Sequence, residues 1–178
     1  MGLFDRLMGR DLPERRDARR IYFRLLEQAR TPAFFGPDRF ADDYDGRIDM
    51  IALHMTIMME RLRAEGEDGK LLNQAIFDEM KDDFEVALRE EGISDTGVKR
   101  RIKPMIGHFY DRLKHYTDAI HSPEPQKSLA DCFVVTRNGD NPSAFALKTA
   151  DYALDWLSDL REMSLSQIIK SRFTFPGI

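Results

Sequence analysis

The sequence predicts an all-α protein that forms a single compact helical domain of about six helices, with no sheet. Apolar residues recur at spacings of three and four along most of the chain, which is the period of an amphipathic helix. Proline, glycine and capping residues separate these stretches at intervals that suit ordinary helices. The chain has 178 residues, of which 42% are hydrophobic and 33% charged, so it is long enough for one core.

Four long helices are expected in the first two thirds of the chain. They cover residues 12–30, 47–65 and 70–91, and the stretch from a cap at Ser94-Asp95 to residue 121. Asp11 should cap the first helix, and Gly66 and Gly69 should end the second. The second helix is apolar on almost every side, which places it in the centre of the domain. Pro104 lies inside the fourth pattern and predicts a kink or a new helix start.

The last third of the chain has a less regular pattern. Residues 129–136 are apolar enough for a strand, but no partner strand is expected elsewhere, so a short helix is predicted. Asn141 should cap the next helix, with Pro142 in its first position. A short helix over residues 164–171 then precedes an extended tail at residues 173–176.

The charge is unevenly distributed along the chain. The net charge is −4, yet residues 1–24 carry seven arginines against four acidic residues, which gives this segment +3. We expect residues 1–11 to form a flexible, basic and amphipathic segment, and residues 12–178 to form the folded domain. A basic segment on an acidic domain suits an anionic partner. The sequence therefore predicts weak peripheral membrane contact through residues 1–24, with a frayed terminus as the alternative.

Several classes of function have no signature in the sequence. Cys132 is the only cysteine, which excludes an intrachain disulfide and fits a reducing compartment. No apolar run reaches the roughly 20 residues of a membrane span. There is no phosphate loop, dinucleotide fingerprint, nucleophile elbow or zinc finger. We therefore expect a cytoplasmic protein that is not an enzyme, needs no cofactor and binds no specific nucleic acid.

One set of polar residues offers an alternative function. Residues at steps of three, four and three share one face of the fourth helix: His108, Asp111, His115 and Asp118. Such a face could hold a divalent metal ion, which gives the alternative of a small helical metal-binding protein or enzyme. The face lies roughly opposite the apolar stripe, however, so solvent is expected to cover it.

Charged residues also mark the second and third helices. Three basic residues recur every seven residues along the second helix: Arg47, His54 and Arg61. A matching acidic line follows the third helix: Asp78, Asp82 and Glu85. Buried charges need partners, so these lines predict a structural ion-pair seam between the two helices. In the alternative interpretation, some of these groups face a groove and contact a client protein.

Flexible apolar side chains suggest where such a groove would lie. The second and third helices carry more of them than one face can bury: Met50, Met55, Met58, Met59, Phe77 and Met80. Methionine repacks easily around varied partners, so an exposed groove is one interpretation. Charged residues would form its rim: Arg47, Asp49, Asp78, Asp82 and Arg89. The other interpretation is that all these apolar residues form the core.

Short motifs in a fixed order run through residues 20–115. The first is Asp45-Gly46-Arg47-Ile48-Asp49-Met50, followed by Leu53-His54 and Arg61-Leu62. The second is Gln74-Ala75-Ile76-Phe77-Asp78, followed by Leu88-Arg89-Glu90-Glu91-Gly92-Ile93-Ser94-Asp95. Weaker matches are Ala29-Arg30-Thr31-Pro32 and Phe109-Tyr110-Asp111-Arg112. Together these motifs resemble the ubiquinol–cytochrome c chaperone family. Ile48, Asp111 and Pro104 depart from the usual Phe, Gly and Lys-rich stretch.

The resemblance implies a non-enzymatic assembly chaperone. Members bind newly made cytochrome b and assist biogenesis of the ubiquinol–cytochrome c reductase (bc1) complex. The ribosome and a small helical protein are further partners that it suggests. The chain lacks a long basic presequence, so we expect a bacterial member in the cytoplasm, peripheral to the inner face of the plasma membrane.

Polar and aromatic residues in and around the motifs are the candidates for partner binding, although motif residues can equally serve packing. They are Arg47, Asp49, His54, Arg61, Gln74, Asp78, Asp82, Arg89, Glu90, Tyr110 and Arg112.

Overall fold

The computed structural model of the chain describes residues 13–133 and 141–178. Within these residues the protein consists of α-helices, one short 3-10 helix and their connections, and no strand is formed, which confirms the all-α fold class. The expected segment 1–11 and the cap at Asp11 lie outside the described residues. No helix in the described part of the chain is long and apolar enough to cross a bilayer.

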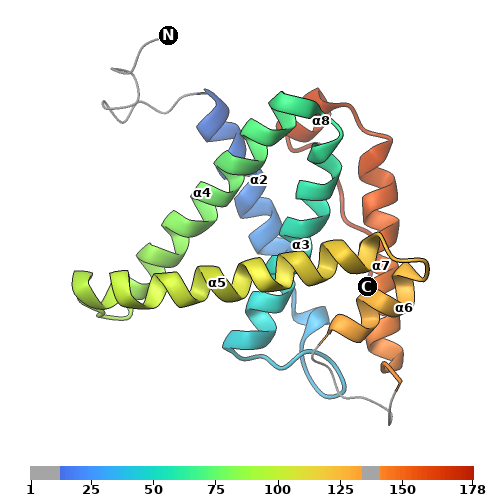
Figure 1. Ribbon diagram of the computed structural model, residues 1–178, viewed down its shortest axis with the longest axis horizontal. Coiled ribbons are helices and arrows are strands. Elements are labelled where there is room, and N and C mark those ends of the chain that lie inside the picture. The colour runs from blue at the N-terminus through green and yellow to red at the C-terminus, as the bar shows by residue number, and fades with distance from the viewer. Residues whose placement is uncertain (1–12, 134–140) are drawn as a thin grey trace.

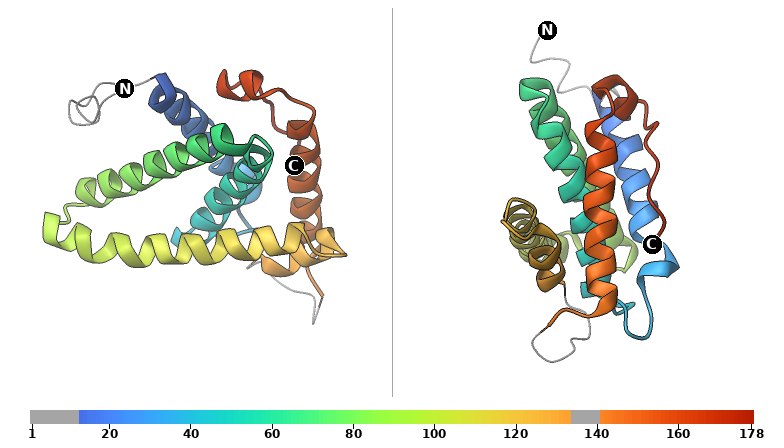
Figure 2. Two further views of the ribbon diagram at one scale, coloured as in Figure 1. Left: turned by 45° about the horizontal axis from the view of Figure 1, so that its top comes forward. Right: turned by 90° about the vertical axis from the view of Figure 1, so that its right-hand side faces the viewer.

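The helices follow one another in the order shown in Figure 1. They are α2 (Pro13–Ala29), η1 (Pro32–Phe34), α3 (Tyr44–Arg63), α4 (Gly66–Glu90), α5 (Asp95–Ile120), α6 (Pro125–Cys132), α7 (Ala144–Arg161) and α8 (Leu165–Ile169). The two longest, α4 and α5, form a V-shaped arm whose tip is the turn at Gly92 (Figure 2). Gly92 has φ 80°, a conformation that favours glycine at a helix end.

Helix α3 is the centre of the domain, as the sequence predicts. It packs against α2, α4, α5 and α7, so almost every side of it is covered. Residues 49–58 of this helix are buried without interruption. Helices α6 and α7 pack together at the end of the domain away from the tip of the arm.

Of the two interpretations of these methionines, burial in the core applies to four of them, and the exposed groove is not formed by these four. Met50, Met55 and Met58 of α3 and Met80 of α4 are fully buried. Because four helices surround α3, methionines on all its sides pack in the core and leave no groove. Phe77 remains half-buried, and so does Met59.

The boundary between α3 and α4 differs from the prediction for a steric reason. Gly66 adopts φ 61° and starts α4 directly after α3. Gly69 therefore lies inside α4 and does not end α3. A Cβ at position 69 would approach the carbonyl oxygen of Leu62 to 1.9 Å, so only glycine lets the first turn of α4 pass this close.

Helix starts also moved relative to the prediction. Helix α3 begins at Tyr44, three residues early, because the Asp43 side chain accepts a hydrogen bond from the backbone N–H of Gly46 at 2.9 Å. In α7 the cap is Ser143, whose hydroxyl accepts from the N–H of Ala146, and not Asn141. The short helix expected over residues 129–136 is confirmed as far as Cys132, although it starts at Pro125.

Helix α5 continues through Pro104, so the prediction of a new helix start there is wrong. Proline has no N–H to donate to the carbonyl of Arg100. Both Arg100 and Pro104 lie on the exposed side of the helix, where water can satisfy that carbonyl.

The C-terminal tail packs back onto the domain. Phe173 is buried and contacts Trp156, and Phe175 lies 4.8 Å from the Trp156 ring between centroids. The guanidinium of Arg24 lies over the Phe173 ring at 4.9 Å. The tail therefore closes the core over α7 and belongs to the folded domain.

Candidate functional site

Two of the motifs meet in a buried ion pair. Asp49 of α3 accepts from the Nε of Arg112 of α5, and the two atoms are 2.8 Å apart. The Asp49 side chain is 2% exposed and that of Arg112 is 30% exposed. Burial raises the pKa of Asp49 to about 6, while the charge of Arg112 and the hydroxyl of Tyr116 act in the opposite direction. The pair fixes α5 against the first turns of α3.

A pocket opens beside this pair, with a volume of about 320 Å³. It is lined by Tyr44, Asp45, Ile48 and Asp49 of α3 and by His108, Asp111, Arg112 and His115 of α5. The carboxylates of Asp45 and Asp111 are exposed at its rim, and Tyr44 is 53% exposed. Three carboxylates against one guanidinium give the pocket an acidic character. Such a pocket suits a basic or hydrogen-bond-donating group with an apolar stem.

A third motif joins the same region through an aromatic contact. The ring of Phe77 on α4 lies 5.1 Å from that of Tyr110 on α5, with an interplanar angle of 32°. Phe77 also contacts the buried Phe109, at 6.1 Å between ring centroids. Tyr110 is 51% exposed, so the stack has one buried and one open side. Segments of α3, α4 and α5 that are distant in sequence thus converge on the middle of α5.

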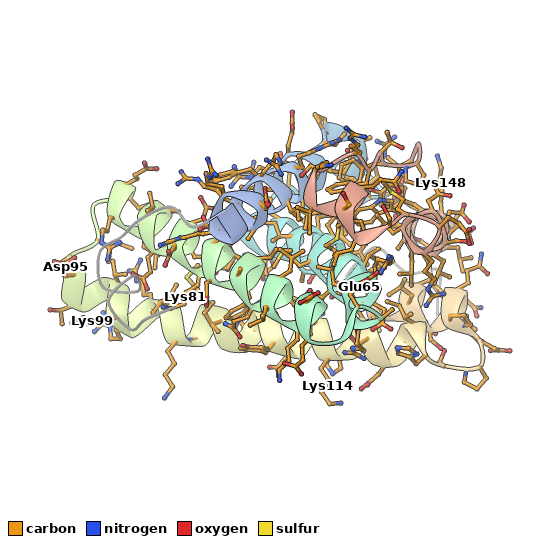
Figure 3. All side chains as sticks on the ribbon, turned by 90° about the horizontal axis from the view of Figure 1, so that it is seen from above. Glu65, Lys81, Asp95, Lys99, Lys114 and Lys148 are labelled. Atoms are coloured by element: carbon orange, nitrogen blue, oxygen red, sulfur yellow. The ribbon has the colours of Figure 1, made fainter. Side chains whose placement is uncertain are left out.

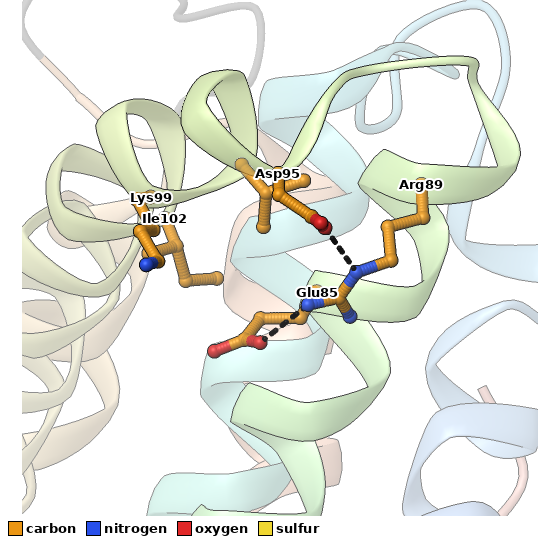
Figure 4. A pocket seen from close by; sticks show the side chains of 6 residues that line it. Glu85, Arg89, Asp95, Lys99 and Ile102 are labelled. Atoms are coloured by element: carbon orange, nitrogen blue, oxygen red, sulfur yellow. Dashed lines mark hydrogen bonds and ion pairs between the residues drawn. The ribbon is translucent and has the colours of Figure 1, made fainter.

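The continuation of the second motif, residues 88–95, forms the tip of the arm. Arg89 of α4 contacts Glu85 at 3.2 Å and Asp95 of α5 at 3.4 Å. These three residues line a second pocket of about 310 Å³, together with Val98, Lys99 and Ile102 (Figure 4). Because Asp95 stands in the first turn of α5, this exposed bridge links α4 to α5 beside the turn at Gly92.

Other predicted site residues lie on the surface without converging on a pocket. Arg47 pairs with Asp42 at 2.9 Å, and Gln74 donates to Asp78 at 2.9 Å. Asp82 is bound by Arg15 of α2 at 2.7 Å. Glu90 is exposed near the tip of the arm. Each of these residues is accessible to a partner.

His54 lies in the core, remote from this surface. Its Nδ1 donates to the carbonyl of Met50 at 2.7 Å, which leaves Nε2 to accept from the hydroxyl of Tyr152 at 2.8 Å. Gln28 of α2 donates in turn to that hydroxyl. Burial lowers the pKa of His54 to about 4, against the smaller effect of the Met50 carbonyl. The histidine is a neutral link between α2, α3 and α7.

Arg61 also serves the interior. It donates to the carbonyls of Leu160 at 2.7 Å and Met163 at 2.6 Å, and it pairs with Glu65 at 2.6 Å. The last carbonyls of a helix have no partner within the helix and attract cations, so the end of α7 is a suitable site for this arginine.

The predicted ion-pair seam between α3 and α4 is therefore wrong. His54 and Arg61 bond to residues of α7, and Arg47 pairs with Asp42. The acidic residues of the expected seam also have other partners. Asp82 pairs with Arg15, and Glu85 pairs with Lys81 and Arg89.

The alternative metal face gains no support from the geometry. His108, Asp111, His115 and Asp118 are all exposed, and Asp118 pairs with Lys114 at 2.7 Å, which lowers the pKa of Asp118. In residues 13–133 and 141–178, no group of three or more His, Cys, Asp or Glu side chains is arranged to hold a metal ion.

Three pocket residues were missed at the level of sequence: Tyr44, Asp45 and Ile48. Two of them belong to the first motif and one precedes it, so the motif itself was the available signal.

Comparisons with known proteins identify the family of the chain. The sequence model of the family described as "Ubiquinol-cytochrome C chaperone" matches residues 39–175. Human "Ubiquinol-cytochrome c reductase complex assembly factor 1" is 25% identical over 107 residues, which are 60% of this chain and 36% of the human protein. The crystal structure of the Cbp3 homolog from Brucella abortus superposes with a TM-score of 0.75 at 27% identity, covering 98% of this chain and 95% of that one. The chain belongs to the ubiquinol–cytochrome c chaperone family.

Proposed function

We propose that the protein binds newly made cytochrome b and holds it for assembly into the bc1 complex. The observation that carries this proposal is the convergence of the family motifs on one surface, formed by the start of α3 and the middle of α4 and α5. Residues of three motifs touch there, through the Asp49–Arg112 pair and the Phe77–Tyr110 stack. We call this surface the α5 site and define it by Tyr44, Asp45, Asp49, Phe77, Tyr110, Asp111 and Arg112.

The chemistry of the α5 site fits a membrane-protein client. Cytoplasmic loops of membrane proteins are rich in lysine and arginine. A basic side chain from such a loop would enter the pocket with its stem against Tyr44 and Ile48 and its charge at Asp45 and Asp111. Tyr110 offers an amphipathic ring for contact outside the pocket.

The remaining candidates have separable roles in this proposal. Exposed residues on α3 and α4 extend the surface available to partners: Arg47, Gln74, Asp78, Asp82, Arg89 and Glu90. His54 and Arg61 are buried with partners from the domain itself, so we assign them to stability. The protein acts in this account by binding, without a catalytic step or a bound cofactor.

We further propose that the protein works at the inner face of a bacterial plasma membrane. A chaperone for a client that inserts as it is made acts beside the membrane and near the ribosome. Residues 1–24 were expected to supply the membrane contact. Arg15, Arg20 and Arg24 from that segment have partners within the domain, so this part of the proposal rests on residues 1–12, Arg16 and Arg19.

The experiment that tests the proposed function is capture of cytochrome b from detergent-solubilised membranes of respiring cells. The tagged wild-type chain should enrich cytochrome b. Asp45→Asn with Asp111→Asn should remove most of this enrichment, because the pocket rim loses its charge. The matched control is Asp155→Asn with Asp159→Asn, two exposed carboxylates on α7. No enrichment by folded wild type, or equal losses in both double variants, would count against the proposal.

A further inference from the structure

The basic N-terminal region uses several of its cations to hold the fold. Arg15 binds Glu79 and Asp82 of α4, at 2.8 and 2.7 Å. Arg20 donates to the carbonyl of Ile169 in α8 at 2.5 Å. Arg24 lies over Phe173 in the tail. An anionic partner therefore finds fewer free charges here than the composition of the segment indicates.

A different set of cations on α5 has no side-chain partner among residues 13–133 and 141–178. Four exposed basic residues lie within five positions near the tip of the arm: Lys99, Arg100, Arg101 and Lys103. None of them forms an ion pair or a hydrogen bond with a side chain of the described residues. The nearby carboxylates of Glu85 and Asp95 are paired with Arg89 instead. Like charges three and four residues apart destabilise a helix. The fold gains nothing from this cluster, so its charge is available to an external anion.

One member of this cluster, Lys103, also begins a stripe along the same helix. Lys103, Gly107, Tyr110 and Lys114 follow at steps of four, three and four, which places them on one face of α5. Figure 3 shows Lys99 near the tip of the arm and Lys114 further along α5. A Cβ at Gly107 would meet nothing within 4 Å, so the middle of the face is open. An extended, flat surface can approach the helix there without a steric barrier.

We propose that the basic cluster of α5 and the stripe beside it together bind the surface of an anionic lipid bilayer. The cations of the cluster can reach lipid phosphates, and the half-exposed ring of Tyr110 can sit among the headgroups, whereas Lys114 is already paired with Asp118 and adds less. The choice of lipid over nucleic acid, which offers the same phosphate chemistry, rests on the proposed function, because a cytochrome b client lies in the membrane.

The bilayer and the pocket would then meet on adjoining sides of one helix. His108, Asp111 and His115 of α5 line the pocket, and the lysine–tyrosine stripe runs beside them along the helix. A client loop in the pocket would lie close to the lipid surface from which it emerges. The V-shaped arm of α4 and α5 would place the domain against the membrane.

Flotation of the full chain with lipid vesicles tests the inference. The probes are vesicles of phosphatidylcholine alone and of phosphatidylcholine with phosphatidylglycerol. The test variant carries Lys99→Gln, Arg100→Gln, Arg101→Gln and Lys103→Gln. The control carries Lys127→Gln, Lys148→Gln, Lys170→Gln and Arg172→Gln, four exposed cations on other elements. Each variant changes the net charge from −4 to −8, so only the position of the lost charge differs.

Wild type and control should float with the phosphatidylglycerol vesicles. The affinity of the test variant for these vesicles should be lower by at least about tenfold. High salt should release the wild type. Equal binding by test and control variants, or no flotation of wild type, would overturn the inference. Binding of single-stranded RNA in place of vesicles, lost only in the test variant, would assign the face to nucleic acid.

The test variant should still capture cytochrome b in detergent. Loss of flotation and loss of client capture can therefore be told apart. Failure of wild type to capture cytochrome b would contradict the proposed function and leave the vesicle result standing.

Discussion

The carboxylate of Asp49 and the guanidinium of Arg112 lie 2.8 Å apart and join the first turns of α3 to the middle of α5. These residues are 63 positions apart in sequence and belong to two motifs of the family. The pair thus has two consequences. It holds α5 on the core, and it forms one wall of the acidic pocket.

Replacing Arg112 should destabilise the fold. Arg112→Ala leaves the buried Asp49 without its cation, and such a loss typically costs about 3 kcal/mol or more. Asp49→Asn should cost less, because it removes the buried charge itself. Urea unfolding followed by circular dichroism measures both. A cost for Arg112→Ala below that for Asp49→Asn would contradict this account of the pair.

The pH dependence of stability should separate Asp49 from His54. The pKa of Asp49 is about 6 in the folded state, compared with 3.8 for an unperturbed Asp. Between these pH values the folded protein therefore binds more protons than the unfolded protein. The contribution of Asp49 to stability falls as pH rises through this range. The pKa of His54 is about 4 in the folded state, compared with 6.5 for an unperturbed His. Between these pH values the folded protein binds fewer protons than the unfolded protein. The contribution of His54 to stability therefore rises with pH through this range.

Variants should reveal these opposite contributions. From pH 4 to pH 6, the stability of Asp49→Asn should rise relative to wild type, and that of His54→Gln should fall relative to wild type. Urea midpoints across this window measure both differences. Parallel slopes in the two variants would show that one of the environments is assigned wrongly.

Arg61 should matter for stability through α7. Arg61→Ala leaves Glu65 and the carbonyls of Leu160 and Met163 without their shared donor, so we expect a loss of about 3 kcal/mol. Arg61→Lys should restore only part of it, since an ammonium lacks the planar fork that reaches both carbonyls. The control is Arg161→Ala, because Arg161 is exposed at the end of α7 and forms no ion pair with the described residues. Comparable losses at positions 61 and 161 would refute the assignment.

Tyr110 should matter for binding more than for stability. Its ring is half-exposed, so Tyr110→Ala should lower the free energy of unfolding by about 1 kcal/mol, the scale of one aromatic pair. Capture of cytochrome b in detergent should fall clearly. Tyr110→Phe keeps the stack on Phe77 and should retain most of the capture. Full capture by Tyr110→Ala would remove this residue from the α5 site.

Periodicity was sufficient to predict the fold class and most helices. The all-apolar pattern of residues 47–65 placed α3 correctly in the centre, because only a helix covered on all sides can have it. Helix ends were less predictable. A glycine that ends a helix and a glycine that permits close approach look alike in sequence, and Gly69 is of the second kind.

Long-range partners could not be predicted from one helix pair. Arg61 and the acidic residues of α4 match by spacing, yet Arg61 reaches the end of α7 because carbonyls are free there. The sequence could not decide between a methionine groove and a methionine core for a similar reason, since the number of helices around α3 is a tertiary property. The family motifs were more informative, because Asp49 and Arg112, selected from two of them, prove to be partners.

The most direct test of the central claim is site-specific photo-crosslinking during synthesis of cytochrome b. A photoreactive amino acid replaces Tyr44 at the pocket or, as the matched control, Phe23 on α2, and both side chains are about half-exposed. We predict a crosslink to cytochrome b from position 44 and none from position 23. Equal crosslinks from both positions, or crosslinks from position 44 that never contain cytochrome b, would contradict binding of this client at the α5 site.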